Sequence, residues 1–202
     1  PYQGSRAFLY TDAGGFQGLP TLGGHDAYAT RLNDAGIVIG SSRVTGPINR
    51  MRACYWENGQ CHPLGPPDAW SNAVDINAAG VVIGTYYDAS QTARGFVQQI
   101  GGAWQPVPAP TGAAVAVGID LNESGQIVGT SDLGVYVYTP GQGTQLVGID
   151  FTPSHINNVG HVAGTLLEPP YVHKVWFWSP ETGQVRLDDV IVPGYEALAA
   201  RT

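Results

Sequence analysis

The sequence predicts an all-β fold built from four-stranded antiparallel units, in the form of a β-propeller. Three observations support this prediction. A motif, Asn-x-x-Gly-x-x-x-Gly, occurs four times; an aromatic-rich segment recurs between its copies; and the 202 residues include 28 glycines and 15 prolines. Such a density of turn-forming residues suits many short strands and leaves little room for long helices.

The motif itself has the composition of a tight β-hairpin. Its four copies begin at Asn33, Asn77, Asn122 and Asn157, at spacings of 44, 45 and 35 residues. The asparagine suits the first position of a type I turn, and the first glycine suits the fourth, where a left-handed backbone completes a three-residue hairpin loop. The second glycine falls inside the next strand, which predicts a bulge or the close approach of another backbone.

An aromatic-rich segment follows each hairpin after a loop, and a glycine-containing turn then leads to a further short strand. Four hairpins stand against five aromatic segments, so the last unit is incomplete or is closed between the termini. Alternatively, the chain is a piece of a longer array, and an open blade or sheet edge would then favour self-association. We predict a single β-propeller repeat domain over residues 1–202, with units near 6–40, 41–84, 85–129, 130–164 and 165–202.

The repeated segments resemble a known family. Arg6-Ala7-Phe8-Leu9-Tyr10, the run Leu19-Pro20-Thr21-Leu22-Gly23-Gly24 and the Asn-x-x-Gly hairpins are similar to the units of the bacterial extracellular HAF-repeat family. The resemblance spans about residues 5–200. It implies a secreted or cell-surface bacterial protein of propeller-like repeat architecture, but it implies no activity and no catalytic residues. Cys54 stands where the family usually has phenylalanine.

Composition and motifs exclude several classes of function. The net charge is −7 and no Lys/Arg cluster occurs, so no nucleic-acid surface is predicted. No apolar run approaches the roughly 18 residues of a membrane span. There is no Gly-x-Ser-x-Gly elbow, and the five histidines lack the spacing of a metal site. We therefore predict no catalytic residue, no metal ligand and no cofactor.

The two cysteines flank a predicted hairpin with Asn58-Gly59 at its tip. That register places Cys54 diagonal to Cys61 on one face of the hairpin. Two interpretations follow: a disulfide formed after local adjustment, or two small buried hydrophobic side chains.

Candidate ligand-binding residues lie in the loops that a propeller gathers on one face, namely those joining the second strand to the third and one unit to the next. Exposed aromatic rings beside Asp, Arg and His suit stacking on a sugar or contact with a partner protein. The alternative is ordinary packing between blades. The candidates are His25, Asp26, Arg50, Trp70, Tyr86, Tyr87, His155, Tyr171 and His173.

The predicted function is that of a non-catalytic extracellular repeat module, which binds or scaffolds a glycan, a protein or further copies of itself. The alternative is a propeller enzyme, a hydrolase or lyase, with its site at the mouth of the central channel.

Overall fold

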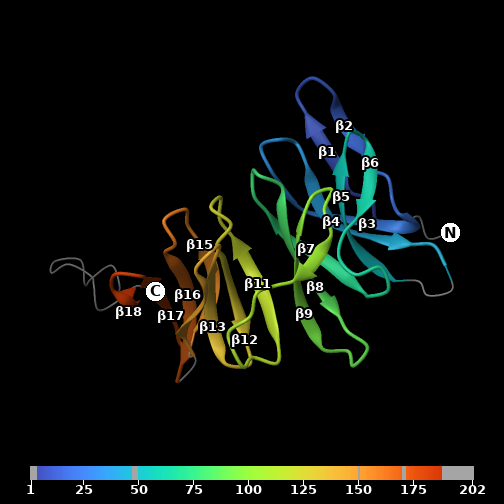
Figure 1. Cartoon of the computed structure of the whole chain (residues 1–202). Coiled ribbons are helices and arrows are strands. Elements are labelled where there is room, and N and C mark those ends of the chain that lie inside the picture. The colour runs from blue at the N-terminus through green and yellow to red at the C-terminus, as the bar shows by residue number, and fades with distance from the viewer. Residues whose placement is uncertain (1–3, 47–49, 150, 170–171, 188–202) are drawn as a thin grey trace.

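The computed structural model describes residues 4–46, 50–149, 151–169 and 172–187, and every element in them is a strand (Figure 1). The all-β prediction is confirmed. The strands form a two-stranded half-sheet and four antiparallel four-stranded sheets, each with its strands in chain order. The half-sheet consists of β1 (Phe8–Thr11) and β2 (Gly15–Gly18). The second sheet consists of β3 (Gly23–Leu32), β4 (Val38–Val44), β5 (Met51–Glu57) and β6 (Gln60–Pro63).

The other three sheets repeat this order. The third contains β7 (Ser71–Ile76), β8 (Val81–Tyr87), β9 (Ala93–Gln99) and β10 (Trp104–Pro106). The fourth contains β11 (Ala116–Leu121), β12 (Ile127–Ser131), β13 (Gly134–Thr139) and β14 (Gly143–Gly148). The fifth contains β15 (Thr152–Ile156), β16 (Val162–Glu168), β17 (Val172–Ser179) and β18 (Gly183–Arg186). The boundaries of the predicted repeat units, at residues 40, 84, 129 and 164, fall within the second strand of each complete sheet, namely β4, β8, β12 and β16.

The sheets follow one another through space in chain order, from the half-sheet to the fifth sheet (Figure 1). Four apolar clusters fill the successive interfaces between them. The half-sheet and the fifth sheet lie at opposite ends, so the described part of the chain forms an open series rather than a closed ring.

Most of the sheets are covered on both faces, which explains why consecutive β-branched residues follow the hairpin turns. In β4, Val38 packs toward the half-sheet and Ile39 toward the third sheet. Successive residues of a strand point to opposite faces, so a sheet covered on both sides needs apolar side chains at both positions. In the fifth sheet Val162 is buried but Ala163 is exposed, because no described sheet covers its outer face. Paired burial recurs at Val82–Ile83 and Ile127–Val128.

The hairpin turns have the predicted geometry. In each, the N–H of the first glycine donates to the asparagine carbonyl at 3.0 Å. These glycines have φ between 76° and 83°, a left-handed backbone that glycine adopts without a steric cost. The asparagine Oδ1 also accepts the N–H four residues later, so the side chain closes the loop that its own backbone begins.

The second glycine of the motif faces a β-bulge on the preceding strand, as predicted. In the second sheet the register of β3 against β4 shifts between Ala29 and Arg31, next to Gly40. The bulge brings the Tyr28 carbonyl oxygen so close to Gly40 that a Cβ atom there would collide with it. Corresponding bulges face Gly84, Gly129 and Gly164.

The four asparagines also join the sheets to one another. Nδ2 of Asn33 donates to the backbone carbonyl of Asn77 at 3.1 Å, Asn77 donates to Asn122 at 3.2 Å, and Asn122 donates to Asn157 at 2.8 Å. We call this series the asparagine ladder. In Asn33, Asn77 and Asn122 the side-chain nitrogen thus donates to a backbone carbonyl of the neighbouring sheet, while the side-chain oxygen closes the residue's own turn. An amide side chain can do both because it carries a donor and an acceptor.

A second set of inter-sheet bonds comes from the residue two positions before the asparagine. Asp75 accepts the backbone N–H of Leu121 at 3.0 Å, and Asp120 accepts that of Ile156 at 2.7 Å. Arg31, at the same position of the first hairpin, lies 3.7 Å from Asp75. Burial, and next the hydrogen bond with Asp120, raise the pKa of Asp75 to about 6.

This raised pKa predicts a pH dependence of stability. Asp75 binds a proton more tightly in the folded chain than in the unfolded one, so its favourable contribution is complete below about pH 4 and is lost as the pH rises to about 6. Asp75→Asn keeps a side-chain oxygen that can accept the Leu121 N–H, but it removes the carboxyl group that titrates. Relative to wild type, the variant should gain up to about 3 kcal/mol in unfolding free energy between pH 4 and 6, measured by urea denaturation.

Asp132→Asn is the matched control for this titration. Asp132 also accepts backbone N–H groups, from Val115 and Ala114, but these bonds lower its pKa. The contribution of Asp132 to stability therefore changes with pH only below about pH 4. The difference in unfolding free energy between Asp132→Asn and wild type should stay constant between pH 4 and 6. A level difference for Asp75→Asn as well would contradict the assignment.

The cysteines lie in the predicted arrangement. Trp56 is opposite Cys61, and Asn58 and Gly59 form the two-residue tip with positive φ at both positions. Cys54 and Cys61 are free thiols in the structure and both belong to the apolar cluster beside the half-sheet. Burial raises the pKa of Cys54, whereas a hydrogen bond from Cys54 lowers the pKa of Cys61. Cys61 is therefore the more reactive thiol of the two.

The structure provides no helix that is both long and apolar enough to span a bilayer, within the residues it describes.

Candidate functional site

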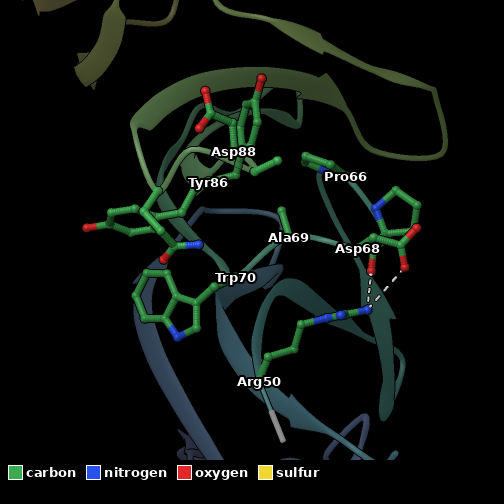
Figure 2. A pocket seen from close by; sticks show the side chains of 11 residues that line it. Arg50, Pro66, Asp68, Ala69, Trp70, Tyr86 and Asp88 are labelled. Carbon is green, nitrogen blue, oxygen red and sulfur yellow. Dashed lines mark hydrogen bonds and ion pairs between the residues drawn. The ribbon is translucent and has the colours of Figure 1, made fainter. Parts of the chain in front are cut away.

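A hollow lies where the second and third sheets meet, and we call it the loop pocket (Figure 2). Its volume is about 630 Å³, within the usual range for small-ligand sites. Its walls come from the residue preceding β5, the loop between β6 and β7, the end of β8 and the loop that follows β8. The lining residues are Arg50, Pro66, Pro67, Asp68, Ala69, Trp70, Tyr86, Tyr87, Asp88, Ala89 and Gln91.

Arg50 and Asp68 form a polar pair at one wall of the loop pocket. The Arg50 guanidinium donates to the Pro67 carbonyl at 2.9 Å and to Asp68 at 3.3 Å (Figure 2). The Asp68 side chain is 93% exposed, so most of its carboxylate remains accessible to a ligand. The pair therefore offers donors and an acceptor side by side, the combination that binds hydroxyl groups.

Two aromatic rings provide the apolar surface of the pocket. Trp70 and Tyr87 contact each other edge to face, with ring centroids 5.3 Å apart. Trp70 is 44% exposed and Tyr87 is 38% exposed, so both rings keep accessible surface. Their backbones are also joined, because the Tyr87 N–H donates to the Trp70 carbonyl at 3.0 Å. Tyr86, which also lines the pocket, packs edge to face against Trp104. The rings are thus held in place before any ligand arrives.

Asp88 organises the loop at the opposite wall. Its carboxylate accepts the Ser90 and Thr92 N–H groups, at 2.9 Å and 3.0 Å, and the Arg94 guanidinium at 2.9 Å. The hydrogen bonds from Ser90 and Arg94 keep the pKa of Asp88 far below its usual range. Asp88 is therefore a permanently ionised structural group.

The structure brings four of the predicted ligand-binding residues into the loop pocket: Arg50, Trp70, Tyr86 and Tyr87. Tyr171 is outside the described residues, and the remaining four predicted residues lie elsewhere. His155 lies opposite Ala163 in the fifth sheet, and His173 lies opposite Leu167.

His25 and Asp26 lie on β3, away from the loop pocket. Asp26 is buried, accepts the Ser5 N–H at 2.9 Å and pairs with Arg43 at 2.6 Å. These bonds tie the segment before β1 to the second sheet. Asp26 therefore stabilises the fold, and the sequence pattern could not separate this role from that of a loop ligand.

Sequence reasoning missed the contributions of Pro66, Pro67 and Gln91 to the pocket. The Gly65-Pro66-Pro67 run was a usable signal, because consecutive prolines stiffen a loop and hold the neighbouring side chains in place. Gln91 has φ of 63°, which only the folded loop reveals.

Comparison with known proteins leaves the family unassigned: no protein-family model and no curated protein sequence matches the chain. Within the described residues, no group of three or more His, Cys, Asp or Glu side chains could hold a metal ion.

Proposed function

We propose that this chain is a non-catalytic binding module that holds a segment of an oligosaccharide in the loop pocket. The observation that carries the proposal is the pair of exposed rings, Trp70 and Tyr87, beside the Arg50–Asp68 pair. Sugars present an apolar C–H face and a rim of hydroxyls, so they are held by an aromatic surface flanked by charged hydrogen-bonding groups.

Two further features support a neutral glycan as the ligand. Arg50 is matched by Asp68, and Asp88 is matched by Arg94, so the pocket carries no excess charge that would select an anion. The open shape of the hollow between two loops also suits a chain that enters and leaves at the surface rather than an enclosed small molecule.

The direct test is a titration of the purified chain with neutral hexasaccharides, such as cello-, xylo-, manno- and laminari-hexaose, followed by tryptophan fluorescence and calorimetry. We expect one of them to bind, and Trp70→Ala to weaken its binding by about tenfold or more, because the ring supplies most of the stacking surface. Arg50→Gln should weaken binding less, since Trp70 and Tyr87 remain.

Phe16→Ala is the control, because Phe16 is a more exposed ring, 74% accessible, on the half-sheet. It should leave affinity unchanged. Equal affinity of Trp70→Ala and wild type would refute the loop pocket as the site, and cleavage of any of the oligosaccharides would favour the hydrolase or lyase alternative.

We also propose that the four-stranded sheets are successive propeller blades and that the protein works outside the cell. The asparagine ladder, which repeats one lateral bond from sheet to sheet, supports the first proposal. The resemblance to HAF-repeat segments supports the second. Small-angle X-ray scattering distinguishes a ring, with its central hole, from an open series of sheets.

A further inference from the structure

We propose that the chain has a second binding site, at the opposite end of the strands from the loop pocket, which takes a single neutral sugar ring. The site is a hollow of about 350 Å³ between the fourth and fifth sheets, and we call it the turn hollow. Its walls come from the β11–β12, β13–β14 and β15–β16 turns and from the end of β17. It shares no residue with the loop pocket, so this inference does not rest on the function proposed above.

The turn hollow coincides with a change in the repeat. The fourth residue after the motif asparagine is Ile37 in the second sheet and Val81 in the third, and both pack against an apolar cluster. In the fourth sheet the same position is Gln126, which lines the turn hollow. A buried amide needs hydrogen-bond partners that isoleucine and valine do not need. The interface between the fourth and fifth sheets is therefore polar where the two preceding interfaces are apolar.

Hydrogen bonds hold Gln126 in one orientation. Its Oε1 accepts from Asn122 Nδ2 at 2.7 Å, and its Nε2 donates to the Thr139 hydroxyl at 3.0 Å. Gly160 packs closely against the same amide, since a Cβ atom added at Gly160 would lie 3.1 Å from Gln126 Oε1. These bonds leave the second Nε2 hydrogen and the Thr139 hydroxyl hydrogen available as donors. Both are in place before any ligand arrives.

Trp178 adds a donor on the buried side of the turn hollow. The side chain is only 5% exposed and belongs to the apolar cluster between these two sheets. At the same register position of the second sheet, Trp56 donates its indole N–H to the Pro20 carbonyl at 2.6 Å. No described residue accepts from the Trp178 N–H, and the nitrogen is not enclosed by protein as that of Trp176 is. A ligand in the hollow can satisfy this donor.

The chemistry of the lining favours a sugar. Gln142, Thr144 and Gln145 line the hollow, and their side chains make no hydrogen bond within the described part of the chain. None of the described residues that line it is charged, so the hollow selects neither an anion nor a cation. Sugar hydroxyls donate and accept, as do amides and threonine hydroxyls. The hollow is smaller and more enclosed than the loop pocket, which suits one compact ring rather than an extended chain.

The test is a titration of the isotope-labelled chain with the methyl glycosides of glucose, galactose, mannose and xylose, followed by NMR of the assigned tryptophan indole N–H signals. We expect at least one glycoside to shift the Trp178 signal saturably, with an affinity of about millimolar order, as is usual for so small a ligand. The Trp70 signal reports the loop pocket in the same spectra. Success or failure of the two sites is therefore read separately.

Two variants locate the binding. Gln126→Leu restores an apolar residue, as at Ile37, and should weaken binding by at least about tenfold because it removes the fixed donor and fills the hollow. Gln145→Leu changes an exposed side chain, so it should leave the fold intact and weaken binding by about threefold or more. Gln17→Leu is the control, since Gln17 is exposed at the corresponding position of β2 and should not affect binding.

Three results would overturn the proposal. The first is that no glycoside shifts the Trp178 signal, including the case in which only Trp70 responds. The second is that Gln126→Leu and Gln145→Leu bind the glycoside as tightly as Gln17→Leu does. The third is that the uncharged peptide acetyl-trialanine-amide shifts the Trp178 signal and the glycosides do not, which would show that the turn hollow is a peptide site.

Discussion

Gly40→Ala is expected to destabilise the protein by more than about 4 kcal/mol, or to prevent it from folding. The added Cβ would collide with the Tyr28 carbonyl oxygen, which the β-bulge in β3 holds in place. A backbone atom cannot move aside as the end of a side chain can. Relief would require β3 to leave β4 and would disturb the packing of both neighbouring sheets. Urea denaturation followed by circular dichroism measures the loss.

Alanine variants of two other glycines serve as controls, because they show what the substitution costs without a backbone collision. Gly36 has φ of 80° and open space around it, so Gly36→Ala should cost about 1–2 kcal/mol through backbone strain alone. Gly18, in β2, does not have a left-handed backbone, and a Cβ atom there would meet no other atom within 4 Å. Gly18→Ala should therefore change stability by less than about 0.5 kcal/mol. An effect of Gly40→Ala no larger than that of Gly36→Ala would show that the bulge yields.

Asn77→Asp is expected to lower the free energy of unfolding by about 3 kcal/mol at pH 7. The substitution keeps the oxygen that accepts the Val81 N–H, but it replaces the amide donor with an oxygen that faces the Asn122 carbonyl. Asn77 is only 2% exposed, so water cannot compensate for the lost donor. An unpaired buried charge or acceptor costs several kcal/mol. Protonation restores a donor, so the loss should shrink below pH 5.

Asn157→Asp tests whether the loss comes from the asparagine ladder or from the turn. Asn157 closes the same kind of turn, with its oxygen accepting the Val159 and His161 N–H groups. Among the described residues none accepts from its amide, and Asn157 is exposed whereas Asn77 is buried. Asn157→Asp should therefore cost less than about 1 kcal/mol. Similar losses at Asn77 and Asn157 would assign the whole effect to the local turn.

Much of the fold could be predicted because its causes are local. The type I turns, the Asn58-Gly59 hairpin tip and the bulge opposite Gly40 each depend on a few neighbouring residues whose backbone preferences are known. The unit of four strands follows from the spacing of those turns. The predicted site was less complete. Loop positions indicated Arg50 and Trp70, but the same reasoning also selected His155 and His173, which lie in the fifth sheet.

The sequence by itself determined the strands, the turns and the repeat, because each depends on contacts between residues close together in the chain. Only the tertiary structure showed that the motif asparagines also bind the next sheet, since that bond joins residues 35 to 45 positions apart. Stacking of the sheets likewise decided that Asp26 is buried in an ion pair while Asp68 faces the loop pocket. Burial and pairing depend on which sheet lies opposite, and no local pattern of residues contains that information.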